Sequence, residues 1–285
     1  MPHPHEVAVS FWRSVLMLLL LFLPADMGIA QSSAPAFWEL RPERADAMLL
    51  QVPDGDDRRY AHLREYFADL HCTSKLMEEQ TIPKHIRKNL MCVLPGKDSE
   101  RILVAARYER RRDITGEGWS EAVMLPMLYN ALQAQPRQHT FIFVELDGSA
   151  GEKEFIDGVR NNHRQPPKAI VVLDSLGLTA PRFYTVPASL VSAKGRERTA
   201  RNKLLESEAF FAAHLLGIPM EEPPSPIAVA NTLLFRADKI PSILVYSDFN
   251  KKVSAPAFHE EFDFVAYFLC RIDNKLAGLP SSSTQ

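Results

Sequence analysis

The feature that most constrains the fold of this chain is a series of short apolar segments that alternate with segments of helical periodicity. Several of these segments are continuous apolar runs, a pattern typical of strands that are covered on both faces. Their alternation with helices predicts an α/β three-layer sandwich with a mostly parallel mixed central sheet. The strands are predicted at Lys88 to Leu94, Ile102 to Tyr108, Thr140 to Leu146, Ala169 to Asp174 and Ser242 to Ser247.

Amphipathic helices are expected before and between these strands. The first has apolar residues at helical spacing from Tyr60 to Leu70. Ser120 is predicted as the N-cap of the second, because its hydroxyl can accept a hydrogen bond from the first turn. The helices are predicted at residues 57–71, 120–133, 199–216 and 257–276.

The composition is that of a globular domain with a buried core. Apolar residues make up 46% of the 285 positions, and 33 Lys and Arg residues nearly balance 35 Asp and Glu residues. The formal net charge of −2 gives the chain no overall attraction to nucleic acid or to an anionic membrane surface. We therefore expect no nucleic-acid partner.

The N-terminus has the pattern of a secretory signal peptide. Arg13 precedes an apolar run from Val15 to Leu23, and Pro24 is followed by small residues that end at Ala30. The run is about half the length that a membrane-spanning helix needs, so we expect no stable membrane anchor after cleavage and a periplasmic or secreted protein. The predicted organisation is a signal peptide over 1–30, a linker and N-terminal segment over 31–56, a globular domain over 57–279 and a disordered tail over 280–285.

Three cysteines leave two interpretations open. Cys72 and Cys92 flank a helix-to-strand connection where they could meet, and a disulfide is permitted outside the cytoplasm. Cys270 would then remain unpaired. Three buried thiols that pack as small apolar side chains are an equally good interpretation.

Four segments in order resemble the motifs of the zinc aminopeptidases, metallopeptidase family twenty-eight, which also includes the glutaminyl cyclases and the transferrin-receptor ectodomain. The resemblance extends from about Asp57 to Asp273 and implies a zinc-exopeptidase-like fold for the domain at 57–279. The matching segments are Asn89 to Gly96 with the strand 102–109, Gly116 to Tyr129, Phe141 to Phe155, and Ala169 to Leu178.

The family implies two zinc ions at the carboxyl ends of the strands, held by His and carboxylate ligands around a bridging water. Two of the ligand positions hold side chains that cannot bind zinc. Arg107 stands where the family has a His, and Leu146 stands where it has a Glu, so neither side chain can coordinate zinc. Glu109 replaces the Asp that supports the missing His, and Glu117 replaces the bridging Asp.

Other family positions are retained. Glu145 matches the general base, and Asp174 matches a metal ligand, so Glu117 and Asp174 are the candidate metal ligands of this chain. Asp147 would take the place of Leu146 after a small register shift. His259 is the histidine closest to the last family ligand, although a surface or capping role suits it better because it opens a helix.

These substitutions predict an exported, catalytically inactive pseudo-peptidase with a binding or structural role and no cofactor. The pocket is expected to hold a peptide end or a small amine. An active metallopeptidase with non-standard zinc ligation is the alternative, and a glutaminyl-cyclase-like acyltransferase would need the same missing ligands. We further expect Arg107 to replace the metal charge by pairing with Glu117, Glu145 and Asp174.

Overall fold

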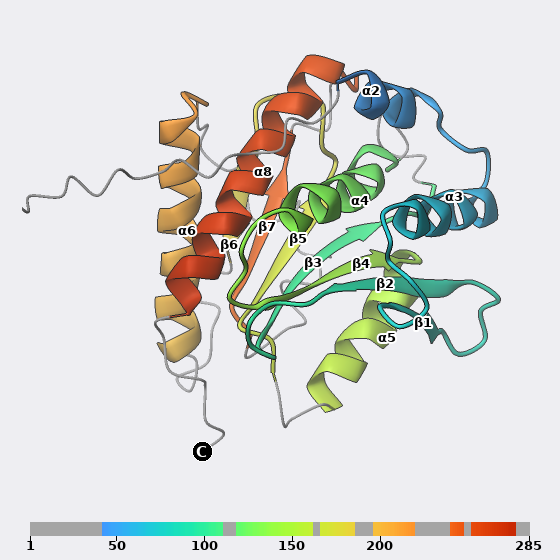
Figure 1. Ribbon diagram of the computed structural model, residues 1–285, viewed down its shortest axis with the longest axis horizontal. Coiled ribbons are helices and arrows are strands. Elements are labelled where there is room, and N and C mark those ends of the chain that lie inside the picture. The colour runs from blue at the N-terminus through green and yellow to red at the C-terminus, as the bar shows by residue number, and fades with distance from the viewer. Residues whose placement is uncertain are drawn as a thin grey trace, which may run out of the picture. The chain divides into compact units, whose positions relative to one another are not determined.

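The protein forms one mixed seven-stranded sheet within the part of the chain that the computed structural model describes, residues 42–110, 118–161, 166–185, 196–219, 240–247 and 252–277 (Figure 1). The strand order is β1-β2-β4-β3-β5-β7-β6. The strands are β1 (Met77–Thr81), β2 (Lys88–Leu94), β3 (Arg101–Arg107), β4 (Thr140–Leu146), β5 (Ala169–Asp174), β6 (Arg182–Thr185) and β7 (Ser242–Tyr246).

The centre of this sheet is parallel and its outer strands are antiparallel. Strands β4, β3, β5 and β7 pair in parallel, so their carboxyl ends meet at one edge. Strand β2 runs antiparallel to β4, β1 to β2, and β6 to β7. The prediction of a mostly parallel mixed central sheet is confirmed.

Helices cover both faces of the sheet. Two apolar clusters, one on each face, join the sheet to different helices: α3, α4, α6 and α8 contribute to the first cluster, and α5 contributes to the second. Figure 1 shows α5 across the sheet from α3, α4 and α8, which makes three layers. The helices are α2 (Pro42–Leu50), α3 (Asp56–Asp69), α4 (Ser120–Gln133), α5 (Gly148–Asn161), α6 (Arg196–Leu215) and α8 (Ala255–Leu276).

The predicted strands and helices are present with ends shifted by three residues at most. The sequence did not reveal β1 and β6, because edge strands need no continuous apolar run; three of the five residues of β1 are exposed. It also did not reveal α5, or α2 within the segment 31–56. Ser120 is the first helical residue of α4 and not its N-cap, which is Trp119 without a capping side chain.

Several predictions concern residues outside the described part of the chain. The signal peptide at 1–30, the tail at 280–285 and the candidate ligand Glu117 all lie there. Among the described helices, none combines the length and the apolar character that a membrane crossing requires.

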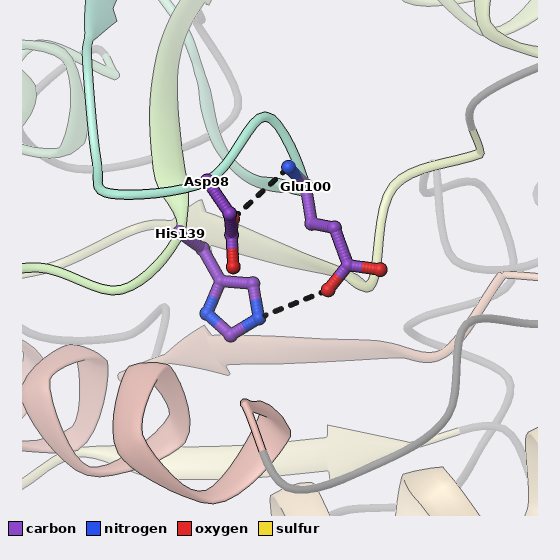
Figure 2. A group of neighbouring side chains, drawn as sticks. All are labelled: Asp98, Glu100 and His139. Atoms are coloured by element: carbon purple, nitrogen blue, oxygen red, sulfur yellow. Dashed lines mark hydrogen bonds and ion pairs between the residues drawn. The ribbon is translucent and has the colours of Figure 1, made fainter.

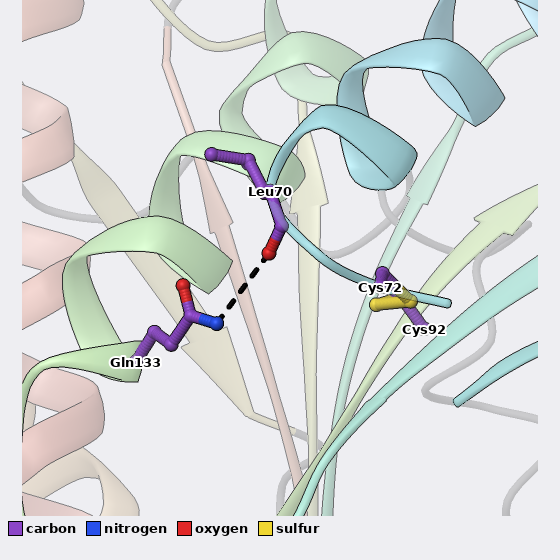
Figure 3. The surroundings of a disulfide bond; sticks show 4 residues. All are labelled: Leu70, Cys72, Cys92 and Gln133. Carbon is purple, nitrogen blue, oxygen red and sulfur yellow. Dashed lines mark hydrogen bonds between the residues drawn. A yellow bond between two sulfur atoms is a disulfide. The ribbon is translucent and has the colours of Figure 1, made fainter. Parts of the chain in front are cut away.

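A disulfide bond joins Cys72 to Cys92 and thereby connects the end of α3 to β2 (Figure 3). Both cysteines are buried, and Cys270 on α8 is the free thiol. Near the bond, the Leu70 carbonyl accepts a hydrogen bond from the side-chain amide of Gln133 on α4 at 3.4 Å. Of the two interpretations that the sequence left open, the disulfide is the one the structure contains.

Removing this disulfide should destabilise the domain by about 3 kcal/mol, because a crosslink over a separation of 20 residues restricts the unfolded chain. The measurement is urea unfolding of the Cys72→Ala/Cys92→Ala variant against the oxidised wild type. Cys270→Ala is the control and should change the free energy of unfolding by less than about 1 kcal/mol. Equal stability of the double variant and the wild type would contradict a stabilising role.

Candidate functional site

The carboxyl edge of the parallel strands is the candidate site, and the strand register decides which of its residues can meet. Arg107 of β3 is aligned with Leu146 of β4, and Ala106 is aligned with Glu145. Side chains alternate between the two faces of a strand, and aligned residues on neighbouring strands share a face. Arg107 and Leu146 therefore lie on one face of the sheet, and Glu145 lies on the other.

The two faces have different surroundings. Leu146 is fully buried in the apolar cluster that includes Phe155 and Ile156 of α5. Phe143, two residues before Glu145, belongs to the cluster of α4 and α8, so Glu145 points to that side. The sheet itself thus separates Arg107 from Glu145.

Arg107 pairs with an acid that sequence analysis did not identify. Its guanidinium forms a hydrogen-bonded ion pair with Glu152 of α5, whose side chain is 1% exposed. The sequence contains a signal for this partner. Phe155 and Ile156 follow Glu152 by three and four residues, so Glu152 falls on the apolar face of its helix. A buried acid on such a face either pairs with a cation or shifts its pKa toward the neutral form.

Glu109 holds the start of the same helix. A Cβ atom added to Gly148, the first residue of α5, would lie 1.8 Å from a carboxylate oxygen of Glu109. Gly148 also has a φ of 58°, which glycine adopts without the strain of a side chain. The carboxylate therefore lies against the helix N-terminus, where a negative charge is favourable. Together, Arg107 and Glu109 connect the end of β3 to α5.

Asn89 of β2 fixes the turn between β4 and α5 from the other side. Its side-chain amide donates to the carbonyl of Gly151 at 2.8 Å and accepts from the backbone N–H of Asp147 at 3.0 Å. Asn89 is fully buried, and a Cβ at Gly151 would lie 2.2 Å from its oxygen. This Asn, part of the first motif of the family resemblance, here has a structural contact.

Glu145 is an unusual buried carboxyl group. It is fully buried, and neither of its oxygens has a hydrogen-bond partner among the described residues. Burial, and secondly the nearby charge of Glu121, raise the pKa of the Glu145 carboxyl well above its usual range. The expected pairing of Arg107 with Glu145 is wrong, and the physical reason is the face on which each lies.

Two further acids are buried on the same side as Glu145. Glu121, in the first turn of α4, is 1% exposed and accepts a hydrogen bond from the Ser120 hydroxyl at 3.1 Å. Glu261 of α8 is fully buried and accepts the backbone N–H of Gly177, although burial still raises the pKa of this carboxyl well above its usual range. Glu261 could have been found from its place on the apolar face between Phe258 and Phe262.

The remaining predicted residues are placed as follows. Asp174 ends β5, is partly exposed and accepts a hydrogen bond from the Ser175 hydroxyl at 3.0 Å. The buried carboxylate of Asp147 forms an ion pair with Arg87 at 2.8 Å. His259 lies within α8, whose N-cap is Ser254, so its capping role is wrong.

The side chain of His259 contacts an acid of helix α2. Its Nε2 lies 2.9 Å from the carboxylate of Asp46 on α2, a helix that the sequence did not reveal. The side chain is 29% exposed, in agreement with the expected surface position.

Solved structures that resemble this chain include aminopeptidases and glutaminyl cyclases. The LapA aminopeptidase of Legionella pneumophila matches with a TM-score of 0.57 and 12% identity, over 83% of this chain and 76% of that chain. The glutaminyl cyclase of Macrostomum lignano matches with a TM-score of 0.63 and 13% identity, over 82% and 89%. That of Fimbriiglobus ruber gives 0.57 and 16%, over 84% and 98%. The chain has the aminopeptidase and glutaminyl cyclase fold.

This fold confirms the zinc-exopeptidase-like architecture that the four motifs implied. No family model and no curated protein matches the sequence. At identities of 11–16%, the matches to these solved structures establish the fold alone.

The described residues at the carboxyl edge do not fit a two-zinc centre. Arg107 has no lone pair to donate and is paired with Glu152, and Leu146 is apolar and fully buried. Glu145 lies on the opposite face of the sheet from Asp174, because Asp174 alternates with Leu173 of the α4 and α8 cluster. The roles of Glu117, Glu145 and Asp174 stay predictions.

Glu145→Gln should stabilise the domain at neutral pH. The pKa of this carboxyl is raised in the folded state, so the folded state binds more protons, and the wild type loses stability as pH rises above the ordinary pKa of 4.5. The variant lacks this loss and should gain at least about 1 kcal/mol over the wild type between pH 4 and pH 8. Urea unfolding across this range tests the effect.

Glu65→Gln on the exposed side of α3 is the control and should change the free energy of unfolding by less than about 0.5 kcal/mol. A difference between Glu145→Gln and wild type that is the same at pH 4 and pH 8 would contradict the raised pKa of the buried Glu145 carboxyl.

The Arg107–Glu152 pair should show strong coupling in a double-mutant cycle. Arg107→Met should cost about 2–4 kcal/mol because it removes the guanidinium that pairs with the buried Glu152 carboxylate, and Glu152→Gln should cost less. The double variant should fall short of the sum by more than about 1 kcal/mol. The free energy of urea unfolding provides all four values.

The exposed pair Lys153 and Asp157 on the same helix is the matched control, with a distance of 3.0 Å between its charged atoms. Its coupling should be below about 0.5 kcal/mol. Equal coupling in the two cycles would show that Arg107 does not anchor α5.

Proposed function

We propose that this protein is an exported, catalytically inactive relative of the aminopeptidases, with a binding or structural role. The observation that supports this most directly is the ion pair of Arg107 with Glu152, at the strand end where the resembled family places a metal ligand. In this chain the end of β3 anchors a helix. A guanidinium in that position supplies positive charge but no electron pair for a metal.

The chemistry of the other edge residues supports the same conclusion. Peptide hydrolysis in the resembled family needs a carboxylate that takes a proton from water. Glu145 has no exposed surface, and its raised pKa favours the protonated form. A carboxyl group without exposed surface does not meet the water that a general base must deprotonate.

The binding role rests on the polar groups that remain near the surface at this edge. Asp174 is partly exposed, and it lies on the same face of the sheet as Arg107, whose side chain is 20% exposed. On this face, the Asp174 carboxylate suits the amino group of a peptide N-terminus or of a small amine, and the Arg107 guanidinium suits the carboxylate of a peptide C-terminus. The proposed ligand is therefore a peptide terminus or an amine.

Export is supported by two independent features. The N-terminal sequence has the pattern of a secretory signal peptide. The Cys72–Cys92 disulfide belongs to an oxidising compartment, since cytosolic thiols are kept reduced in most organisms. We propose a periplasmic or secreted location.

The purified mature protein, with its disulfide intact, should release no product from aminoacyl chromogenic substrates and should not cyclise peptides with N-terminal glutamine. The assay is run with added zinc and with a chelator, beside LapA of Legionella pneumophila as the positive control. The expected rate equals that of buffer, because Arg107 and Leu146 offer no metal ligand among the described residues of this edge and Glu145 is fully buried.

Turnover that disappears with the chelator, and that falls at least tenfold in Glu145→Gln, would overturn this proposal. It would instead establish the alternative, an active metallopeptidase with non-standard ligation. Folding of Glu145→Gln is checked by its urea transition, so that lost activity is not mistaken for lost structure.

A further inference from the structure

A second polar cluster lies at the opposite edge of the sheet. Glu100 directly precedes β3 and His139 directly precedes β4, so both stand at the amino ends of the parallel strands. Asp98 belongs to the loop before Glu100. Figure 2 shows the side chains of these three residues turned toward one another. One donor atom from each lies within 4.8 Å of the other two.

His139 is held in one orientation by a carboxylate behind it. The imidazole is fully buried, and its Nδ1 lies 2.9 Å from Oδ1 of Asp273 on α8. Asp273 also accepts the backbone N–H groups of Gln138 and His139 at 2.8 Å each. A carboxylate that accepts from Nδ1–H leaves the lone pair on Nε2, the arrangement found behind most metal-bound histidines.

The Nε2 atom points into the space between the two acids. It is buried and has no hydrogen-bond partner among the described residues, and Oε2 of Glu100 lies 3.6 Å away. This separation is too long for a hydrogen bond. Two ligands of one tetrahedral zinc ion, with bonds of about 2.0–2.1 Å, stand about 3.3 Å apart, so a small contraction would satisfy both atoms.

The loop that carries the acids is fixed before any ligand arrives. The N–H of Asp98 donates to the Gln138 carbonyl at 2.9 Å, and the hydroxyl of Thr140 donates to the Asp98 carbonyl at 2.9 Å. The N–H of Glu100 donates to Oδ1 of Asp98 at 3.0 Å. A site whose donors are positioned in advance loses less entropy on binding.

The charge around the cluster is predominantly negative. Asp98, Glu100 and Asp273 contribute three carboxylates. Lys168 offsets one of them, since its Nζ lies 2.9 Å from Oε1 of Glu100, and Arg137 acts on Asp273 from a greater distance. Glu100 thus presents one oxygen to Lys168 and the other to His139.

We propose that Asp98, Glu100 and His139 bind a divalent metal ion, zinc in the first place, at the amino edge of the sheet. One imidazole nitrogen and two carboxylate oxygens are a donor set suited to zinc, and the exposed side of Asp98 leaves room for water as a fourth ligand. This site lies at the amino ends of the parallel strands, at the opposite edge of the sheet from their carboxyl ends. Its role is to fasten the loop 95–100 and, through Asp273, the end of α8 to the sheet.

The test is calorimetric titration of the full mature protein, disulfide intact, with Zn²⁺ at neutral pH. The wild type should bind one ion at this site, and Asp98→Asn and Glu100→Gln should each weaken it at least tenfold. Both substitutions keep one oxygen that can accept from Glu100 N–H or Lys168, and they remove the negative charge and one ligating oxygen. Zinc should also raise the thermal unfolding midpoint of the wild type, and it should leave the midpoint of the Asp98→Asn/Glu100→Gln double variant unchanged.

Asp157→Asn on the exposed side of α5 is the matched control and should bind zinc as the wild type does. Asp174→Asn tests whether an ion binds at the carboxyl edge instead. Absence of binding at zinc concentrations up to 1 mM, which means a Kd above roughly that value, would overturn the proposed site. Zinc binding that Asp98→Asn and Glu100→Gln do not change would also overturn it. Loss in Asp174→Asn alone would place the ion at the carboxyl edge. That result would count against the proposed inactivity and not support the amino-edge site.

Discussion

Burial of the parallel sheet on both faces is the constraint on which the rest of the structure depends. Strands β3, β5 and β7 consist almost entirely of buried residues, with α3, α4 and α8 on one face and α5 on the other. An unpaired charge in the middle of such a layer would cost several kcal/mol. Functional polar groups are therefore confined to the two ends of the strands, and each end has its own cluster.

Strand alternation then divides the carboxyl edge into two separate environments. Arg107 faces α5 and finds Glu152 there, whereas Glu145 faces α4 and α8 and finds two more buried acids. Both residues stand at strand ends one position apart in the register, yet the sheet lies between them. In this protein the ion pair connects a strand to a helix, whereas burial raises the pKa of the Glu145 and Glu261 carboxyl groups.

The buried acids also bear on ligand binding. Glu145 and Glu261 are fully buried, and burial raises the pKa of both carboxyl groups. Burial disfavours the charged form of such carboxyl groups, and groups without exposed surface do not contact a ligand. A ligand at this edge would meet Asp174 and Arg107 instead, on the face where part of each side chain reaches the solvent.

The sequence by itself determined the fold class, because apolar runs and helical periods are local features of the chain. It did not determine the edge strands β1 and β6, whose stability comes from pairing with distant strands. Only the tertiary structure decided that Cys72 meets Cys92, that Arg107 meets Glu152 and that His139 meets Asp273. Each of these contacts depends on the register of the strands and on the face of the sheet from which a side chain projects. A register shift of one residue would move the side chains of a strand to the opposite face.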